Sequence, residues 1–168
     1  QYNAVCRARG TLMHYQIEQN LNGRLMLGPY SPEFKQFLQF REDWFNAGTG
    51  RFPERTELSL FHEELKIAGQ ADLLCKERDG TYSVIDWKRC KQLKFDNPFD
   101  NMFKPLDHLP DCNYNQYCLQ LNMYRYVLET KYDKNISSMH IVVFHPNQAT
   151  YECHEIERMD SEISAIVD

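Results

Sequence analysis

The 168-residue chain is 42% hydrophobic and carries a formal net charge of −5 at neutral pH. This length and composition suit a single domain with a substantial core. Because no apolar run approaches the roughly eighteen residues of a membrane span, we expect no membrane segment. The acidic balance argues against a protein that binds nucleic acid by bulk electrostatics, although a local basic field at one cleft would not require a basic chain.

The cysteine pattern and the ends of the chain bear on its cellular context. The six cysteines are scattered, without a CxxC pair, and we expect no signal peptide. This is typical of reduced thiols in an intracellular protein. The chain lacks an initiator methionine, and both ends fall in segments with regular patterns. We therefore expect residues 1–168 to form one domain of a larger protein.

Helix and strand signals cover most of the chain. A first helix, 7–22, ends at Asn22-Gly23, which has C-cap chemistry. Ser31-Pro32-Glu33 provides the N-cap and first turn of a second helix, which stops before Gly48. Beyond it we expect strands at about 55–62, 65–76 and 81–89, a long loop over 91–112, a helix over 113–131, a strand over 139–144, an edge strand over 150–154 and a closing helix over 157–167. This order predicts an α/β (α+β) fold with a mixed central sheet flanked by helices.

Two of these strands are joined by the hairpin signal Glu77-Arg78-Asp79-Gly80-Thr81. A two-residue Asp79-Gly80 loop would place Asp72 opposite Trp87. A three-residue loop, with Gly80 as a bulge residue, instead pairs Glu77 with Thr81 and sets Asp72 opposite Asp86. We predict the second register.

The residues Asp72, Asp86 and Lys88 carry the chemistry of this hairpin. Side chains two apart on a strand share a face, so Asp86 and Lys88 point the same way. In the predicted register, the Cβ atoms of the two aspartates lie roughly 5 Å apart, which is unfavourable unless a cation or proton intervenes. Oxygen ligands favour a hard ion such as Mg²⁺ or Mn²⁺, which can orient a water for phosphodiester cleavage. The alternative is a surface hairpin with ordinary charges.

Two helical motifs accompany the hairpin. His14 lies in the first helix, and Gln120 and Tyr124 are four apart in the helix 113–131, hence on one face. Leu119, Met123, Tyr126 and Val127 of that helix are available to pack. Each motif alone is more often structural than functional.

The succession of motifs is more specific than any one of them. G-x-x-x-H at His14, G-x-x-D at Asp72, D-x-K at Asp86 and Lys88, and Q-x-x-x-Y at Gln120 resemble the RecB-like exonuclease branch of the PD-(D/E)xK nuclease superfamily. The resemblance spans about residues 8–146. It implies a restriction-endonuclease-like core of αβββαβ type and a metal-dependent deoxyribonuclease acting in replication, repair or recombination.

The resemblance also implies residue roles, which we state as expectations. His14, Asp72, Asp86 and the backbone carbonyl of Trp87 would bind one or two Mg²⁺ or Mn²⁺ ions, and Lys88 would be catalytic. Gln120 and Tyr124 would support the site or contact DNA, either single-stranded or at a duplex end. Glu57 is a possible auxiliary acid, for which Glu63 and Glu64 compete. The cations after the catalytic strand, Arg89 and Lys91 among them, would grip the phosphate backbone or, alternatively, lie at a solvated strand end.

The sequence departs from some relatives in ways that leave alternatives open. Ala71 precedes Asp72 where the superfamily name has proline. Some relatives hold an iron–sulfur cluster with four cysteines, and the cysteine spacing here predicts none. A related RNA endonuclease and a non-catalytic nucleic-acid-binding module remain alternatives. Fused or associated helicase or replication modules would be natural partners.

Overall fold

The computed structural model describes residues 2–168, and this part of the chain forms four helices and five strands. The elements are α1 (Tyr2–Leu21), α2 (Pro32–Phe45), β1 (Phe52–His62), β2 (Ile67–Lys76), β3 (Tyr82–Lys88), α3 (Asn113–Lys131), β4 (Ile136–Val143), β5 (Glu152–Glu155) and α4 (Asp160–Val167). The order confirms the predicted one, with helix α1 starting earlier than expected.

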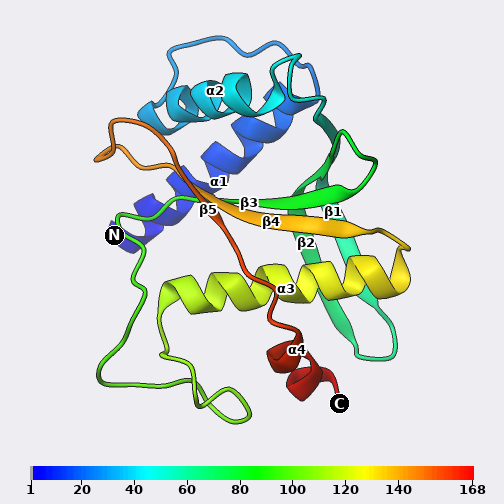
Figure 1. Ribbon diagram of the computed structural model, residues 1–168. Helices are drawn as coiled ribbons and strands as arrows, with labels where there is room; N and C mark the ends of the chain where they lie inside the picture. Colours follow the sequence, from blue (N-terminus) through cyan, green and yellow to red (C-terminus); the bar gives the residue numbers. More distant parts are fainter. Residues whose placement is uncertain (1) are drawn as a thin grey trace.

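The five strands form one mixed sheet in the order β1-β2-β3-β4-β5 (Figure 1). The pairs β1–β2, β2–β3 and β4–β5 are antiparallel, whereas β3 and β4 are parallel. Parallel neighbours need a long crossover, and here the segment after β3 together with α3 provides it. The mixed sheet confirms the predicted fold class.

The hairpin between β2 and β3 has the predicted three-residue loop. Glu77 and Thr81 face each other, with the Glu77 N–H donating to the Thr81 carbonyl at 2.8 Å. Gly80 has a φ of +86°, a backbone conformation that glycine adopts without steric cost. The register continues as far as Leu73 opposite Ile85. One further step in this register sets Asp72 opposite Asp86, as predicted.

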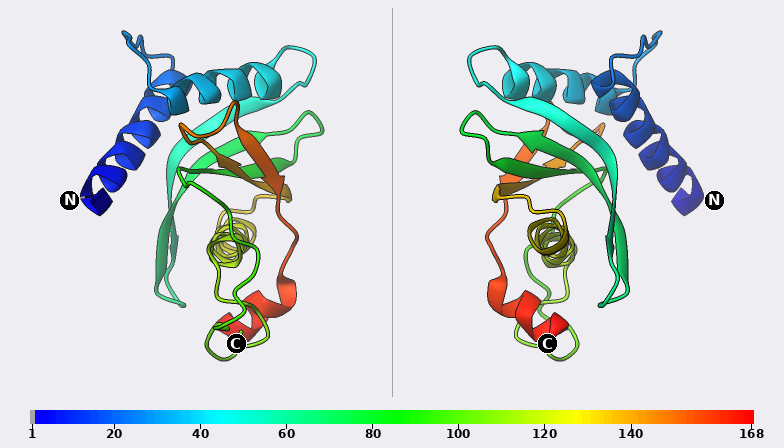
Figure 2. Two further views of the ribbon diagram at one scale, coloured as in Figure 1. Left: turned by 90° about the vertical axis from the view of Figure 1, so that its left-hand side faces the viewer. Right: turned by 90° about the vertical axis from the view of Figure 1, so that its right-hand side faces the viewer.

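The sheet separates two hydrophobic layers, with α1 and α2 on one face and α3 and α4 on the other (Figure 2). Phenylalanines of α2 pack on the first face around Trp87, which is 1% exposed. Leu121 and Leu128 of α3 pack on the other face, against strand residues such as Val84. Strand β3 alternates between the two layers. Trp87 therefore points to α2, while Asp86 and Lys88 share the face of Val84.

The ends of two helices follow the capping chemistry read from the sequence. The Ser31 hydroxyl accepts a hydrogen bond from the Phe34 N–H at 3.2 Å, which is an N-cap for α2. Beyond α1, Gly23 has a φ of +73°, and the Arg24 N–H donates to the Gln19 carbonyl at 2.9 Å. This is the bond pattern of a glycine-terminated helix.

The long loop over 91–112 is also present, with one isolated bridge between Asn101 and Pro110. Within residues 2–168, none of the helices combines the length and apolar character needed to cross a membrane.

Candidate active site

Asp72 lies where strands β2 and β3 separate. The backbone pairing of β2 with β3 ends at Leu73 and Ile85. Beyond this point the Asp72 carboxylate, instead of its backbone, bonds to β3. Its Oδ2 accepts a hydrogen bond from the backbone N–H of Trp87 at 2.8 Å. The side chain is thereby held between the two strands, within reach of both faces of the sheet.

His14 of α1 contacts the same carboxylate from the α1 side of the sheet. Its Nε2 lies 3.2 Å from Asp72 Oδ2, and its Nδ1 lies 2.9 Å from the Gly10 carbonyl. Burial alone would lower the pKa of His14, but the hydrogen bond and charge of Asp72 raise it to about 9. The pair is therefore an ion pair at neutral pH.

Asp86 and Lys88 form a second pair on β3. The Lys88 Nζ lies 2.8 Å from Asp86 Oδ2, and their side chains are 19% and 6% exposed. Burial raises the pKa of Asp86 to about 7, and the negative charge of Asp72 adds to this effect. Burial would lower the pKa of Lys88, but the Asp86 carboxylate outweighs it and the net pKa is raised. Lys88 is thus a protonated ammonium.

Helix α3 completes the surroundings of Lys88. Gln120 Oε1 accepts a hydrogen bond from Lys88 Nζ at 3.0 Å, and the same nitrogen lies 4.4 Å from the centre of the Tyr117 ring. Tyr124, one turn beyond Gln120, packs against Gly69 of β2 so closely that a Cβ there would lie 2.6 Å from its ring. The Gln120/Tyr124 face predicted from the sequence therefore faces the aspartate strands. The contact of Tyr117 was not foreseen, although it lies one turn before Gln120.

Glu57 lies opposite Asp72 across strands β1 and β2. The register pairs Thr56 with Leu73 and Leu58 with Ala71, which leaves Glu57 facing Asp72. Glu57 has a φ of 47°, and it interrupts the ladder opposite Asp72. Burial, together with the charge of Asp72, raises its pKa to about 7.

Glu57, Asp72 and Asp86 thus form a row of acids on three adjacent strands. The two competitors for the auxiliary acid lie elsewhere. Glu63 and Glu64 are exposed beyond the end of β1, and Glu64 pairs with Lys131 at 3.1 Å.

Arg89 is placed differently from the sequence expectation. Its Nε donates to Glu33 Oε1 at 2.7 Å, and the two side chains are 8% and 7% exposed. A guanidinium that is buried in an ion pair with Glu33 is not available to bind a phosphate backbone. We therefore correct the expected role of Arg89 to a structural one. Lys91 is exposed and remains accessible.

Comparison with protein families identifies the chain. The model of the PD-(D/E)XK nuclease superfamily matches residues 7–166. The chain belongs to this superfamily. Membership explains the mixed sheet with helices on both faces and implies a nuclease, that is, a phosphodiester hydrolase.

Other comparisons add little to this assignment. No curated protein matches the sequence. Among solved structures, the crystal structure of SSO0001 is similar, with 17% sequence identity and a TM-score of 0.40. The similarity covers 79% of this chain and 53% of that one, so this chain spans about half the length of that protein.

PD-(D/E)XK nucleases typically use divalent metal ions. The chemical type of the donor atoms in this site suits such an ion. They are carboxylate oxygens with a neighbouring imidazole. Asp86 Oδ2 is buried, and it lies 2.8 Å from the Lys88 ammonium. In residues 2–168, however, no three His, Cys, Asp or Glu side chains converge as a metal-holding group. Asp72 faces His14, and Asp86 faces Lys88.

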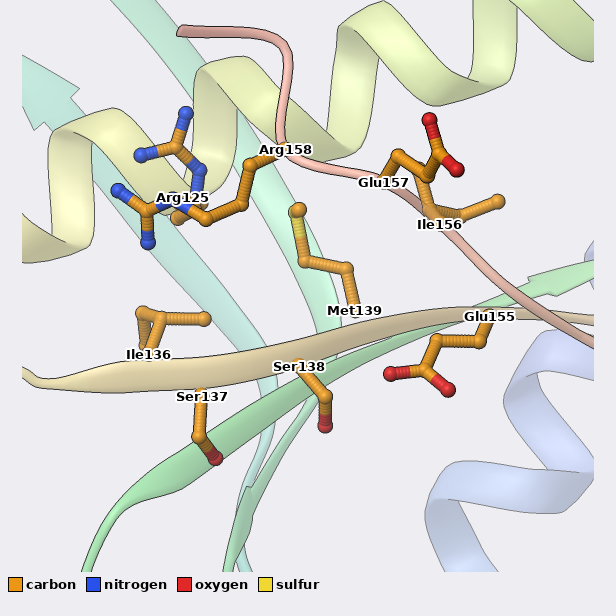
Figure 3. Close-up of a pocket in the computed structure, with 9 residues that line it drawn as sticks. All are labelled: Arg125, Ile136, Ser137, Ser138, Met139, Glu155, Ile156, Glu157 and Arg158. Carbon is orange, nitrogen blue, oxygen red and sulfur yellow. The ribbon is translucent and has the colours of Figure 1, made fainter.

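A separate cavity of about 440 Å³ lies between β4, the segment after β5 and α3 (Figure 3). It is lined by Arg125, Ile136, Ser137, Ser138, Met139, Glu155, Ile156, Glu157 and Arg158. None of the predicted site residues lines it. Arg125 bridges Glu129 at 2.9 Å and Asp160 at 2.8 Å, so its charge is already neutralised. The cavity is therefore separate from the residues that the sequence predicts to form the nuclease site.

Proposed function

We propose that the chain is a metal-dependent exonuclease of the RecB-like branch that hydrolyses DNA phosphodiester bonds in replication, repair or recombination. The observation that carries this proposal is the row of Glu57, Asp72 and Asp86 ending at Lys88 and Gln120. It combines acids that can hold a hard cation with a fixed ammonium beside them.

The roles of the acids follow from their positions. Asp72 and Asp86, with His14 and the Trp87 carbonyl, would hold Mg²⁺ or Mn²⁺, and Glu57 would assist. The bound ion would supply an activated water and neutralise charge on the phosphate. The absence of an iron–sulfur cluster stays a prediction.

Lys88 acts as a charge and not as a base in this proposal. Its raised pKa keeps the amine protonated, so it donates hydrogen bonds to the attacking water or to a phosphate oxygen. Such a fixed donor stabilises the negative charge that develops during hydrolysis. Gln120 holds the ammonium in position, and Tyr124 supports the strand beneath it.

The decisive experiment is digestion of end-labelled linear DNA and of circular DNA with Mn²⁺, alongside matched RNA. We expect linear DNA to shorten while circular DNA survives. Degradation of circular DNA would instead establish an endonuclease, and cleavage of RNA with DNA left intact would establish the RNA-cleaving alternative.

Lys88→Ala provides the mechanistic control. We expect it to lower kcat by about a hundredfold or more, because the charge beside the reacting phosphate is lost. The fold and Mn²⁺ binding should persist. Lys76→Ala, an exposed lysine at the end of β2, should keep full activity. Wild-type turnover by Lys88→Ala would remove Lys88 from the mechanism.

A further inference from the structure

The 91–112 loop exposes three phenylalanine rings to solvent. Phe95 is 56% exposed, Phe99 is 91% exposed and Phe103 is 92% exposed. Exposed apolar side chains scattered singly are common. Three rings at a spacing of four residues, in one loop that follows the Lys88 strand along the chain, call for a functional explanation.

The loop is held in shape by its own hydrogen bonds. The Met102 N–H donates to the Leu109 carbonyl at 2.9 Å, and the Asp111 N–H donates to the Asp100 carbonyl at 3.0 Å. The Asn97 amide also donates to the Asp111 carbonyl at 2.9 Å. The rings are therefore displayed on a structured support.

The loop begins directly after the Lys88 strand and ends at α3. Its first part lies on the start of that helix, where the Asn113 side chain accepts a hydrogen bond from the Lys94 N–H at 2.8 Å. The Phe95 ring packs on the Tyr114 ring with centroids 4.6 Å apart. Tyr117, one turn along α3, lies under the Lys88 ammonium. Aromatic rings thus lead from the candidate catalytic lysine onto the loop.

The farther part of the loop runs toward α4 (Figures 1 and 2). There His108 Nε2 lies 3.1 Å from Glu162 Oε1, which ties the loop to that helix. Phe99 and Phe103 belong to this part. Both follow Phe95 along the loop, on the way from the Lys88 strand to this helix.

The charge of the loop argues against a phosphate grip. It contains three lysines and four aspartates, so its net charge is slightly negative. Counterion release by lysine and arginine is the main source of duplex binding, and this loop supplies little of it. Stacking on bases requires no net charge, because every base presents an aromatic face.

The exposure of the rings also argues against an apolar protein partner. A ring that is more than nine-tenths exposed contacts almost nothing, including its neighbouring phenylalanines. Protein interfaces instead use contiguous apolar patches. Separate rings on a fixed support match unpaired bases.

We propose that Phe95, Phe99 and Phe103 form a stacking surface that binds a single nucleic-acid strand and feeds it to Lys88. This rests on the proposed nuclease function and specifies its substrate as single-stranded. A base-paired duplex keeps its bases stacked on one another, so it cannot use these rings.

The test is fluorescence anisotropy with a labelled single strand and the corresponding duplex, in a Lys88→Ala parent that prevents cleavage. Phe99→Ala with Phe103→Ala should raise the Kd for the single strand roughly tenfold or more, since stacking carries much of the affinity for single strands. The Kd for the duplex should not change. The same double change to Trp should preserve or tighten binding, and the change to Leu should weaken it as much as Ala does.

The matched control is Phe52→Ala with Phe61→Ala, which removes two phenylalanines of β1 that are 61% and 54% exposed. It should leave the Kd unchanged. Binding of the single strand unaffected by the loop variants would overturn the proposal. So would full binding by the Leu variant, because an apolar contact would then suffice, as in docking to a protein.

Failure of the nuclease proposal is distinguishable from failure of the stacking surface. Cleavage is measured with intact Lys88, whereas binding is measured without it. A chain that cleaves DNA normally after loss of both rings, and still binds the single strand, refutes only the stacking surface. If the chain cleaves no DNA, but the loop variants still weaken binding of the single strand, only the nuclease proposal is refuted.

Discussion

At the scale of single residues, the ion pair between Arg89 and Glu33 fixes the backbone next to Lys88. Arg89 follows Lys88 directly, and Glu33 lies in the first turn of α2. The Lys88 carbonyl is held as well, by the Phe144 N–H at 2.9 Å. Because both charges are buried, removing one partner leaves the other without compensation.

Glu33→Gln should therefore destabilise the fold by about 3 kcal/mol. The effect depends on pH. Burial would raise the pKa of Glu33, but hydrogen bonds from its own backbone N–H and from Arg89 lower it overall, below the ordinary value of a glutamate. A depressed pKa contributes stability above the unfolded value, and this contribution is lost as pH falls through the folded value. Urea unfolding between pH 7 and pH 3 should show a shallower acid limb in the variant. Identical acid limbs would contradict a stabilising charge at Glu33.

Asp86 gives a second prediction at this scale. Asp86→Ala should weaken Mn²⁺ binding measured by calorimetry, while Asp107→Ala, an exposed residue of the 91–112 loop, should not. The pKa of Asp86 is raised to about 7, and a carboxyl must lose its proton to hold a cation. Affinity should therefore fall as the pH drops below about 7, and less steeply in the variant. Unchanged Mn²⁺ affinity would remove Asp86 from the metal site.

At the scale of elements, α3 approaches the sheet through the contact of Tyr124 with Gly69. Glycine is needed here because of close packing and not because of a special turn. A Cβ at this position would meet Tyr124 Cε1 at 2.6 Å and the Tyr124 hydroxyl oxygen at 3.3 Å. The ring cannot stay where it is if residue 69 gains a side chain.

Gly69→Ala should displace the Tyr124 ring and reduce activity about tenfold, because misplacement of supporting groups by about 1 Å costs catalysis heavily. A crystal structure of the variant would show the shift. Tyr124→Phe, which keeps the ring but loses the hydroxyl, separates packing from hydrogen bonding. An unmoved ring and normal activity in Gly69→Ala would show that α3 does not position the site.

Sequence patterns predicted the helices, the strands and the register of the hairpin correctly, because these features depend on local chemistry. Strand alternation fixed the shared face of Asp86 and Lys88, and Gly80 fixed the loop length. The buried face of helix α3 was harder to predict. Asn122 and Arg125 are buried, at 0% and 2% exposed, whereas Leu119 and Met123 are only half-buried.

Hydropathy cannot foresee such an arrangement, since some of the partners of these two polar residues, such as Glu157 and Asp160, are distant in sequence. The expected phosphate contact of Arg89 was wrong because its ion-pair partner is distant in sequence. Its partner Glu33 lies 56 residues earlier, and the residues around Arg89 do not indicate this pairing. Glu57 became distinguishable from Glu63 and Glu64 only once β1 was paired with β2.

At the scale of the whole molecule, Asn122 joins the C-terminal segment to α3. Its amide donates to the Cys118 carbonyl at 2.9 Å and to the Glu157 carbonyl at 3.0 Å. Its side-chain oxygen accepts from the Met159 N–H at 2.8 Å. One buried side chain thus satisfies backbone groups on both sides of the junction that leads into α4.

Asn122→Ala should destabilise the fold by about 2 kcal/mol, because buried backbone groups lose their partners. Hydrogen exchange should quicken over residues 157–168 more than in the sheet. Thr130→Ala, exposed on the same helix, is the control and should change neither quantity by much. Uniform exchange across the chain would show that the C-terminal segment does not depend on this residue.

The three-residue turn between β2 and β3 makes the function sensitive to strand register as well as to residue type. Side chains on a strand alternate between faces, so a shift of one position in the pairing exchanges every one of them. Closing the turn with Asp79 and Gly80 alone would pair Arg78 with Thr81, send the Trp87 indole toward the α3 side and place the ammonium of Lys88 in the aromatic layer beneath α2. A relative with all the motif letters intact but a turn that favours this slipped pairing would be expected to have lost the activity. The pairing of Asp72 with Asp86 is therefore a sharper criterion for a working member than the letters themselves.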